Sequence, residues 1–244
     1  MKDIFKMTDA DFRQYALNLG EDEVKDLPKS QLDPALIEEL IEICGKDHVS
    51  IDDYDRLSVA YGKTAYDTLR LREKQVDSLP DVVVYPSTSR EVEAVVDFSV
   101  RHKIPLYVYG GGSSVTMGVE PTKGGISLDM RRNFQHVIEF NEVDQTITVQ
   151  SGMSGPRLES LLNDAVKQFG AKRAYTCGHF PQSFEYSSVG GWVVTRGAGQ
   201  NSTYYGCITD LVMGQKYATP IGVIHTSTYP QEATGPNLNQ IMMG

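Results

Sequence analysis

Three consecutive glycines, Gly110, Gly111 and Gly112, constrain this chain more than any other stretch of it. They follow the short apolar run at residues 104–108, which predicts a buried strand, so the glycines begin where a strand ends. Each glycine loses maximal backbone entropy on ordering, and three in a row therefore favour neither a strand nor a helix. They suit a backbone that adopts positive φ and approaches another group closely. Successive amides can converge there on an anion.

A phosphate or pyrophosphate group is the natural ligand of such a loop, and a plain glycine–serine turn is the structural alternative. The loop does not match the two commoner phosphate-binding patterns. The Rossmann fingerprint needs glycine where Val115 stands. The P-loop pattern needs glycine five positions before the Gly62-Lys63-Thr64 tripeptide, where Leu57 stands. We therefore expect another fold to hold the anion.

The acidic composition limits the partners of the chain. Its 244 residues carry a formal net charge of −9 and no run of more than two Lys or Arg, which argues against a nucleic-acid partner. A phosphate would then be held by backbone amides. No apolar run reaches transmembrane length, and the N-terminus lacks the apolar core of a signal peptide. Cys44, Cys177 and Cys207 show no CxxC spacing, so we expect no disulfide framework, no metal site and a reducing cytoplasm.

Residues 1–75 predict a helical N-terminal extension. One amphipathic helix is expected at residues 8–20, and a clearer one, with good signals at both ends, at residues 33–45. Residues 52–78 mix charged and apolar side chains without a clean period. We expect them to pack on the main domain, residues 76–244, with a boundary near Val76.

Strands and helices alternate after this boundary. Thr88 and Glu91 form a capping box that starts one helix, and Pro156 opens another that ends at Gly170. Strands are predicted at residues 82–85, 104–109, 126–128, 137–141 and 146–150, the last two as an antiparallel hairpin. The fold class is therefore α+β, with a small parallel unit before a mainly antiparallel part.

A second informative stretch covers residues 178–210, which are rich in glycine, serine and aromatic side chains. Only residues 189–195 are predicted to be helical, and loops this long inside a compact domain are usually functional. Gly190 and Gly191 allow a backbone to come close to another surface. The alternative interpretation is that Trp192 and its neighbouring valines are simply core.

Three segments together carry a resemblance to a known family. They read YGGGSSV at residues 109–115, PQSFEYSSVGGW at 181–192 and YGCITDL at 205–211. In this order and at these separations they resemble the FAD-binding domain of the vanillyl-alcohol-oxidase (PCMH-type) superfamily. Within it the chain is most similar to the alkyldihydroxyacetonephosphate synthases, over roughly residues 55 to 244.

The resemblance implies a two-subdomain PCMH-type fold with FAD extended between the subdomains. The glycine loop would hold the pyrophosphate, and the second stretch would line the flavin and its ribityl chain. The FAD-binding residues implied in this way are Val108, Tyr109, Gly110, Gly111, Gly112, Ser113, Ser114, Gln182, Ser183, Phe184, Glu185, Tyr186, Ser187, Ser188, Thr195, Arg196, Gly197 and Ala198. Gln182 replaces the usual Asp, and Gly197-Ala198 replaces Ala-Ser. Because the loop lacks the histidine that links FAD in some relatives, non-covalent FAD is expected.

Relatives continue beyond the stretch that ends here at Gly244 into a cap domain that carries the catalytic residues. We therefore expect a portion of a longer flavoenzyme, truncated before the cap domain, inactive alone, and dimeric, if at all, through the absent half. The leading function is that of an FAD-dependent oxidoreductase or FAD-linked oxidase resembling alkyldihydroxyacetonephosphate synthase, acting on a small-molecule substrate. The alternatives are an FAD-linked dehydrogenase of a D-2-hydroxy acid such as lactate or glycolate, and a flavin-binding module without chemistry. For His179, a structural role is favoured over a role as an acid–base group. Arg196 either stabilises reduced flavin or makes a surface salt bridge.

Overall fold

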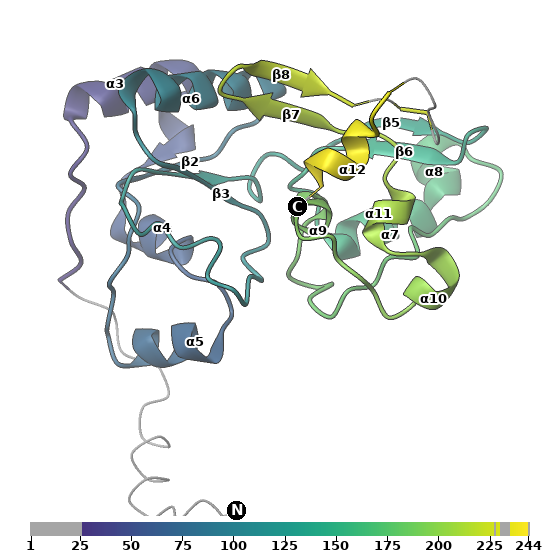
Figure 1. The fold of residues 1–244 in the computed structure, drawn as a ribbon, viewed down its shortest axis with the longest axis horizontal. Helices are drawn as coiled ribbons and strands as arrows, with labels where there is room; N and C mark the ends of the chain where they lie inside the picture. The colour runs from purple at the N-terminus through teal and green to yellow at the C-terminus, as the bar shows by residue number, and fades with distance from the viewer. Residues whose placement is uncertain (1–25, 227, 230–234, 244) are drawn as a thin grey trace, which may run out of the picture.

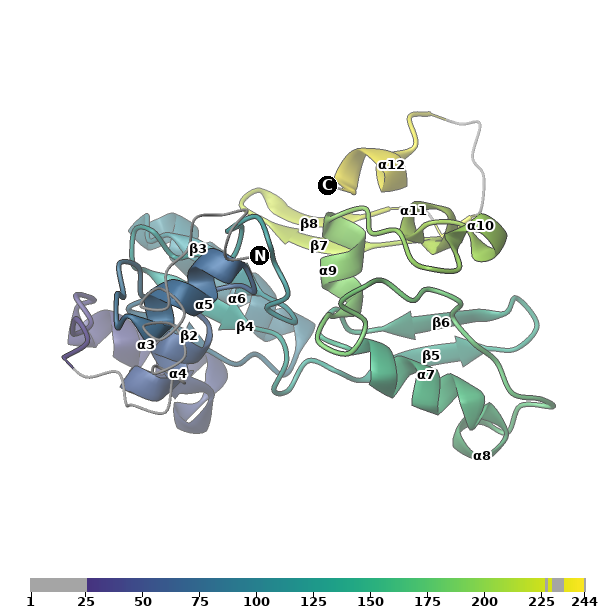
Figure 2. The same cartoon turned by 90° about the horizontal axis from the view of Figure 1, so that it is seen from below.

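The computed structural model describes residues 26–226, 228–229 and 235–243, and the helix predicted at residues 8–20 lies outside them (Figure 1). The helices are α3 (Pro34–Cys44), the 3-10 helix η1 (Lys46–His48), α4 (Asp53–Ser58), α5 (Ala65–Arg72), α6 (Ser89–His102), α7 (Gly155–Asn163), α8 (Ala165–Phe169), α9 (Val189–Val194), α10 (Ser202–Tyr205), α11 (Ile208–Leu211) and α12 (Leu238–Met242). The strands are β1 (Val49–Ser50), β2 (Val82–Val84), β3 (Leu106–Tyr109), β4 (Ile126–Asp129), β5 (Val137–Asn141), β6 (Thr146–Val149), β7 (Lys216–Thr219) and β8 (Gly222–His225). They form the predicted α+β fold of two subdomains, which lie side by side (Figures 1 and 2).

A four-stranded sheet in the order β1-β2-β4-β3 forms the centre of the first subdomain. β2, β4 and β3 run parallel, and β1 adds to β2 in the antiparallel sense. The predicted strand–helix–strand unit β2–α6–β3 is present, but its two strands are not neighbours. β4, which comes later in the sequence, pairs with both of them. The crossover through α6 therefore leaves a gap that the next strand fills.

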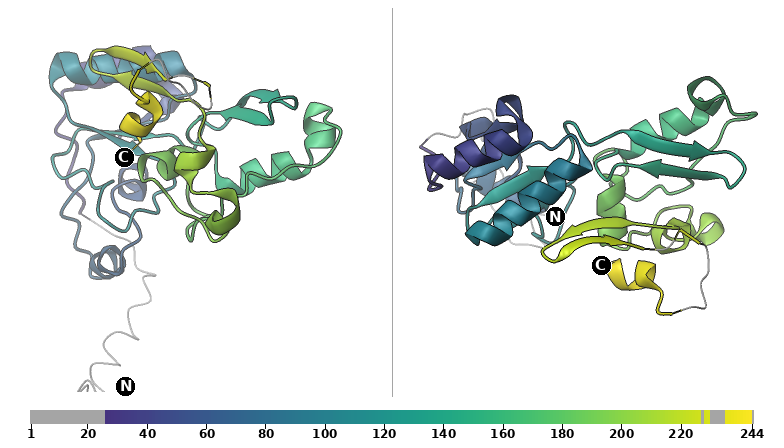
Figure 3. Two further views of the ribbon diagram at one scale, coloured as in Figure 1. Left: turned by 45° about the vertical axis from the view of Figure 1, so that its right-hand side comes forward. Right: turned by 90° about the horizontal axis from the view of Figure 1, so that it is seen from above.

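The central strands β2 and β4 are buried on both faces, which explains the continuous apolar sequence of β2. Val82 and Val84 point to one face and pack with Phe98 of α6 and Leu40 of α3. α3 and α6 lie side by side over that face (Figure 3). Val83 points to the other face, in a separate cluster with Val59 and Tyr109, among others.

The ends of α3 and α6 form as the sequence predicts. The Asp33 side chain accepts a hydrogen bond from the Ala35 amide at the start of α3, and Gly45 ends the helix with a φ of 93°. Thr88 and Glu91 make both bonds of the capping box at the start of α6. Local side-chain chemistry therefore fixes where these two helices begin.

Residues 49–72, predicted as part of a helical extension, contain a strand as well as helices. β1 pairs with β2 of the main sheet, and α4 packs against β2. α5 begins with a capping box formed by Thr64 and Asp67. The boundary near residue 76 stays a prediction, but this segment is integrated with the first subdomain by backbone pairing and by helix packing.

The second subdomain contains the predicted β5–β6 hairpin and a core that includes Met153, Leu158 and Trp192. The single helix predicted from Pro156 to Gly170 is wrong, because the chain breaks at Asp164 into α7 and α8. Asparagine and aspartate side chains compete with the helix backbone for hydrogen bonds. The Asn163 amide group donates to the Glu159 carbonyl oxygen at 2.7 Å, and the neighbouring Asp164 leaves the helical conformation, with φ −101° and ψ 24°.

The long segment at residues 178–210 contains three short helices. α9 confirms the helix predicted at residues 189–195, whereas α10 and α11 were predicted to be irregular. Helices of four residues are too short to show a hydrophobic period, so the pattern could not reveal them. At α11 the Asp210 side chain accepts from the Cys207 amide at 2.8 Å.

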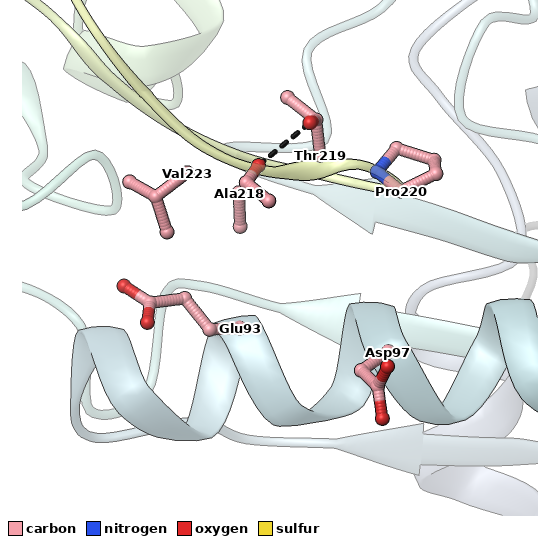
Figure 4. Close-up of a pocket in the computed structure, with 7 residues that line it drawn as sticks. Glu93, Asp97, Ala218, Thr219, Pro220 and Val223 are labelled. Atoms are coloured by element: carbon pink, nitrogen blue, oxygen red, sulfur yellow. Dashed lines mark hydrogen bonds between the residues drawn. The ribbon is translucent and has the colours of Figure 1, made fainter.

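The β7–β8 hairpin brings a late part of the chain back to the first subdomain, and the sequence interpretation missed it. The hairpin lies along α6, where Lys216 Nζ is 2.7 Å from Glu93 Oε1. A cavity of about 110 Å³ lies between the helix and the hairpin turn, lined by Glu93 and Asp97 on the helix side (Figure 4). The hairpin therefore bridges the two subdomains (Figure 1).

Candidate functional site

The backbone amides of the glycine loop, residues 110–114, donate no hydrogen bond within the described part of the chain. β3 ends at Tyr109, which is 3% exposed, and the loop starts at the next residue. Gly112 has a φ of 67°, and no other residue of the loop has a positive φ. Backbone donors inside a protein almost always have partners. A run of five free amides is therefore suited to bind an anion.

Gly110 and Gly111 face the second informative stretch directly. A Cβ atom on Gly111 would lie 1.9 Å from the carbonyl oxygen of Tyr186, and one on Gly110 would lie 2.4 Å from Ser188 Oγ. The sequence interpretation gave the glycines positive φ and a close approach to phosphate, which is wrong in its first part for these two residues. They are needed because another part of the chain packs against them.

The segment that meets the loop belongs to the second subdomain. The Ser183 carbonyl oxygen accepts from the amides of Tyr186 and Ser187, both at 2.9 Å, which closes a tight turn. The Trp192 indole N–H donates to Ser187 Oγ at 2.6 Å, and Ser188 caps α9 by accepting from the Gly191 amide at 3.3 Å. The two stretches that the sequence singled out therefore touch each other across the subdomains.

Thr195, Arg196, Gly197 and Ala198 lie at the opposite end of α9 from this contact. Arg196 has a φ of 51°, which is strained for a residue with a side chain, and its guanidinium donates to Gln240 Oε1 at 3.1 Å. The surface salt bridge, one of the two alternatives for Arg196, is absent among the described residues. α9 is six residues long, so residues 195–198 lie about 9 Å along its axis from the contact at Ser187 and Ser188.

The residues implied by the resemblance fall into three classes of exposure. The exposed ones are Val108, Gln182, Glu185, Tyr186, Thr195, Arg196 and Ala198. The half-buried ones are Gly110, Gly111, Ser113, Ser114, Ser183, Phe184 and Gly197. The buried ones are Tyr109, Gly112, Ser187 and Ser188. Exposed residues that share a turn or a helix with buried ones give a surface that is both accessible and rigid.

His179 lies behind this surface and is 1% exposed. Its ring meets Trp192 edge-on with centroids 4.9 Å apart, and a Cβ on Gly197 would be 3.5 Å from His179 Nε2. Neither ring nitrogen has a hydrogen-bond partner among the described residues. Burial lowers the pKa of His179 and favours the neutral ring.

The sequence interpretation missed the residues that support the loop from the first subdomain. The Lys63 amide donates to the Ser114 carbonyl oxygen at 2.8 Å, and the Tyr109 hydroxyl donates to the Tyr61 carbonyl oxygen at 3.2 Å. A Cβ on Gly62 would lie 2.2 Å from the Ser114 carbonyl oxygen. The sequence feature that could have pointed to this support is the glycine of Gly62-Lys63-Thr64, a tripeptide that was compared only with the P-loop pattern.

Similarity to known proteins assigns the chain to a family. A family described as FAD binding domain matches residues 80–228 of the chain. The chain belongs to this family. It is 30% identical over 229 residues to alkyldihydroxyacetonephosphate synthase of Trypanosoma brucei brucei, covering 92% of this chain and 36% of that protein. A solved alkyldihydroxyacetonephosphate synthase structure matches with a TM-score of 0.83 and 28% identity, over 91% of this chain and 40% of that one.

A second relative represents another activity. The mitochondrial D-lactate dehydrogenase [cytochrome] 1 of Saccharomyces cerevisiae is 24% identical over 213 residues, covering 86% of this chain and 34% of that protein. The chain therefore spans between a third and two fifths of the length of these relatives.

FAD is the cofactor of this family, and the residues of the site fit it. The pyrophosphate of FAD is an anion that accepts hydrogen bonds, and the loop offers five consecutive donors without other partners among the described residues. The loop contains no Lys or Arg, so the donors available there are the backbone amides and the hydroxyls of Ser113 and Ser114.

Proposed function

We propose that the chain is the FAD-binding part of a flavoenzyme that forms alkylglycerone phosphate, the reaction of an alkyldihydroxyacetonephosphate synthase. In that reaction the acyl chain of acyl-dihydroxyacetonephosphate is exchanged for a long-chain alcohol. The synthase of Trypanosoma brucei brucei matches 92% of the chain, and this supports the proposal. The observation that carries the FAD site is the run of free amides at residues 110–114.

The amides of the glycine loop hold the pyrophosphate in this proposal, and Gly112, with its positive φ, turns the loop around it. The turn at residues 182–188 and the segment at residues 195–198 line the flavin and the ribityl chain. Ser187 and Ser188 already bond within the protein, so their role is to keep the turn rigid. FAD is bound non-covalently, because residues 108–114 contain neither histidine nor cysteine.

When bound, FAD supplies a two-electron centre at the flavin ring, close to which a small-molecule substrate is held. The residues of this chain bind and orient the cofactor. Trp192, Phe184 and His179 form the aromatic layer behind the proposed flavin wall and exclude water from it. The groups that act on the substrate are not assigned to residues of this chain.

A second candidate is an FAD-linked dehydrogenase of a D-2-hydroxy acid such as lactate or glycolate. The similarity to the yeast D-lactate dehydrogenase favours it over unrelated flavin chemistry. A third candidate is a flavin-binding module without chemistry of its own. All three need the same FAD site, so the site is tested separately from the reaction.

The experiment has two steps. The purified chain is titrated with FAD, and quenching of flavin fluorescence gives the dissociation constant. The protein as encoded in its natural reading frame is then offered each substrate without oxygen. Exchange of acyl-dihydroxyacetonephosphate with a labelled long-chain alcohol, without an electron acceptor, supports the synthase. Bleaching of the flavin band at about 450 nm by D-lactate or glycolate supports the dehydrogenase, and binding with neither response supports the module.

The cellular setting is also proposed. No helix of the described residues is long and apolar enough to cross a membrane. We propose a cytoplasmic enzyme, a location supported by three cysteines without disulfide spacing. A homodimer formed through parts that the relatives carry in addition is the assembly we expect, and sedimentation of the natural protein tests it.

A further inference from the structure

The glycine loop has a second neighbour besides the turn of the second subdomain. Residues 61–63 run along the loop, with the Lys63 amide bonded to the Ser114 carbonyl oxygen and Gly62 packed flat against the same group. The Tyr109 hydroxyl lies below Gly112, where a Cβ would come within 2.0 Å of it, and donates to the Tyr61 carbonyl oxygen. The contact therefore fixes the loop at Gly112 and at Ser114.

The same segment also holds the chain that leaves the loop. Arg70 of α5 donates to Glu120 Oε1 at 3.0 Å and pairs with Glu120 Oε2 at 3.0 Å. It also donates to Asp67 Oδ1 at 2.8 Å, and its guanidinium lies 3.8 Å from the centre of the Tyr61 ring. Ser78 Oγ completes the cluster by donating to Glu120 Oε1 at 2.7 Å. One arginine thus connects residue 61 before the loop contact with residue 120 after it.

The cluster is deeply buried, since Arg70 is 3%, Asp67 1% and Glu120 9% exposed. Hydrogen bonding by Arg70 is the chief reason that the pKa of Glu120 is lowered, which keeps the carboxylate charged. Buried ion pairs add little stability compared with apolar side chains of similar size, because desolvation offsets the attraction. What such a pair does supply is a fixed geometry between the elements that carry its members.

We infer that residues 61–70 form a clamp that holds the glycine loop in its FAD-binding shape before FAD arrives, with Arg70 as the positioning residue. The inference rests on the proposed FAD site at the loop. A glycine-rich loop with free amides has many conformations to lose on binding, and a loop held in advance loses fewer. The clamp lies outside residues 80–228, so the matched family region does not include it.

The chain offers a matched control in Arg56. This arginine is 2% exposed and lies in α4 of the same segment, but it donates hydrogen bonds to Asp53 and to the carbonyl oxygens of Pro80 and Pro28. Arg56 and Arg70 are therefore both buried arginines, but of the two it is Arg70 that contacts Tyr61 and Glu120, the residues that connect it with the two sides of the loop. The variants Arg70→Met and Arg56→Met separate positioning of the loop from general stability.

The test measures the FAD dissociation constant of each variant by flavin fluorescence, at a temperature at which far-UV circular dichroism shows each chain folded. We expect Arg70→Met to weaken FAD binding at least tenfold and Arg56→Met less than twofold, even where both lower the unfolding temperature equally. Arg70→Lys, which keeps the charge beside Glu120, should restore part of the affinity. If FAD binding weakens in proportion to the loss of stability, and does so to the same degree in both variants, the inference is overturned. If Arg70→Met does not fold, Glu120→Gln carries the same prediction and the same contradiction.

A measurement without FAD separates this inference from the proposed function. Hydrogen exchange of the cofactor-free chain reports on the Lys63 amide, whose bond to Ser114 is part of the clamp. We expect at least tenfold faster exchange there in Arg70→Met and an unchanged rate in Arg56→Met. An unchanged Lys63 rate in Arg70→Met would overturn the clamp, whether or not the chain binds FAD. Failure of the unaltered chain to bind FAD would instead contradict the proposed function.

Discussion

The glycine loop lies between two supports that differ in what side chains contribute. On the side of the clamp, the close contact of Gly62 with Ser114 is reinforced by side chains, namely the Arg70–Glu120 ion pair and the Tyr109 hydroxyl. On the side of the second subdomain, the absence of a side chain admits it, because a Cβ on Gly111 would overlap the carbonyl oxygen of Tyr186. The first support can be weakened one group at a time. The second should fail as soon as one carbon atom is added.

Replacing Gly111 by alanine should have the largest effect, since a backbone carbonyl 1.9 Å from the new Cβ cannot rotate away. We expect the free energy of unfolding to fall by about 3 kcal/mol, at the upper end for overpacking, and FAD binding to be lost. Guanidinium denaturation and flavin fluorescence measure the two effects. Gly118→Ala is the control, because its Cβ would be 3.8 Å from the nearest atom, Ser114 Oγ. Equal stability of the two variants would contradict the close contact.

Removing the Tyr109 hydroxyl should have a moderate effect. Tyr109→Phe leaves the buried Tyr61 carbonyl oxygen without this donor, and we expect a loss of about 1 kcal/mol in unfolding free energy. Tyr107→Phe on the same strand is the matched control, because the Tyr107 hydroxyl accepts a hydrogen bond from the exposed Lys123 amide. Urea denaturation of both variants decides the point. A loss as small in Tyr109→Phe as in Tyr107→Phe would mean that this bond does not support the loop.

Groups on the two sides of the loop should lose their contributions to stability at different pH values on acidification. We expect this to be the smallest of the three effects. Burial lowers the pKa of His179 below its ordinary value of 6.5, so the unfolded chain binds this proton more readily. Stability should therefore fall as the pH drops below about 6.5. The pKa of Glu120 is lowered below 4.5, chiefly by the hydrogen bond from Arg70. Its contribution should be kept down to about pH 4.5 and lost as the pH falls further.

Trp192 fluorescence can follow this difference, because Trp192 is the one tryptophan of the chain and contacts the His179 ring. Urea titrations across this pH range should show a flatter profile for His179→Gln than for the unaltered chain between about pH 7 and pH 5.5. Glu120→Gln should differ in slope only below about pH 4.5. Parallel profiles of His179→Gln and the unaltered chain would show that His179 does not cause the loss of stability below about pH 6.5.

Elements with short-range signals could be predicted from the sequence. Asp33 and Gly45 mark the two ends of α3, and the capping box marks the start of α6. The β7–β8 hairpin could not be predicted in the same way, since its position depends on α6, more than a hundred residues earlier. The break at Asp164 was missed because the apolar pattern of the segment continues through it.

In the site, too, features with short-range sequence signals could be predicted, whereas contacts between distant parts of the chain could not. Both stretches that form it were found from their composition, but their contact was not, because residues about 75 positions apart leave no periodic signal. The role of Gly111 was misassigned for that reason, since the group that excludes a side chain is the Tyr186 carbonyl. Arg70 and Glu120 were not singled out, because a buried ion pair resembles two surface charges until the fold is known.

In the proposed FAD site, the free amides at residues 110–114 bind the pyrophosphate. Amide NMR spectra of the ¹⁵N-labelled chain, titrated with FAD, ADP and riboflavin, test it most directly. FAD and ADP, which share the pyrophosphate, should both shift the amide signals of Gly110, Gly111, Gly112, Ser113 and Ser114. Riboflavin, which lacks it, should leave them in place. Binding of FAD with these five signals unmoved would mean that the loop does not hold the pyrophosphate.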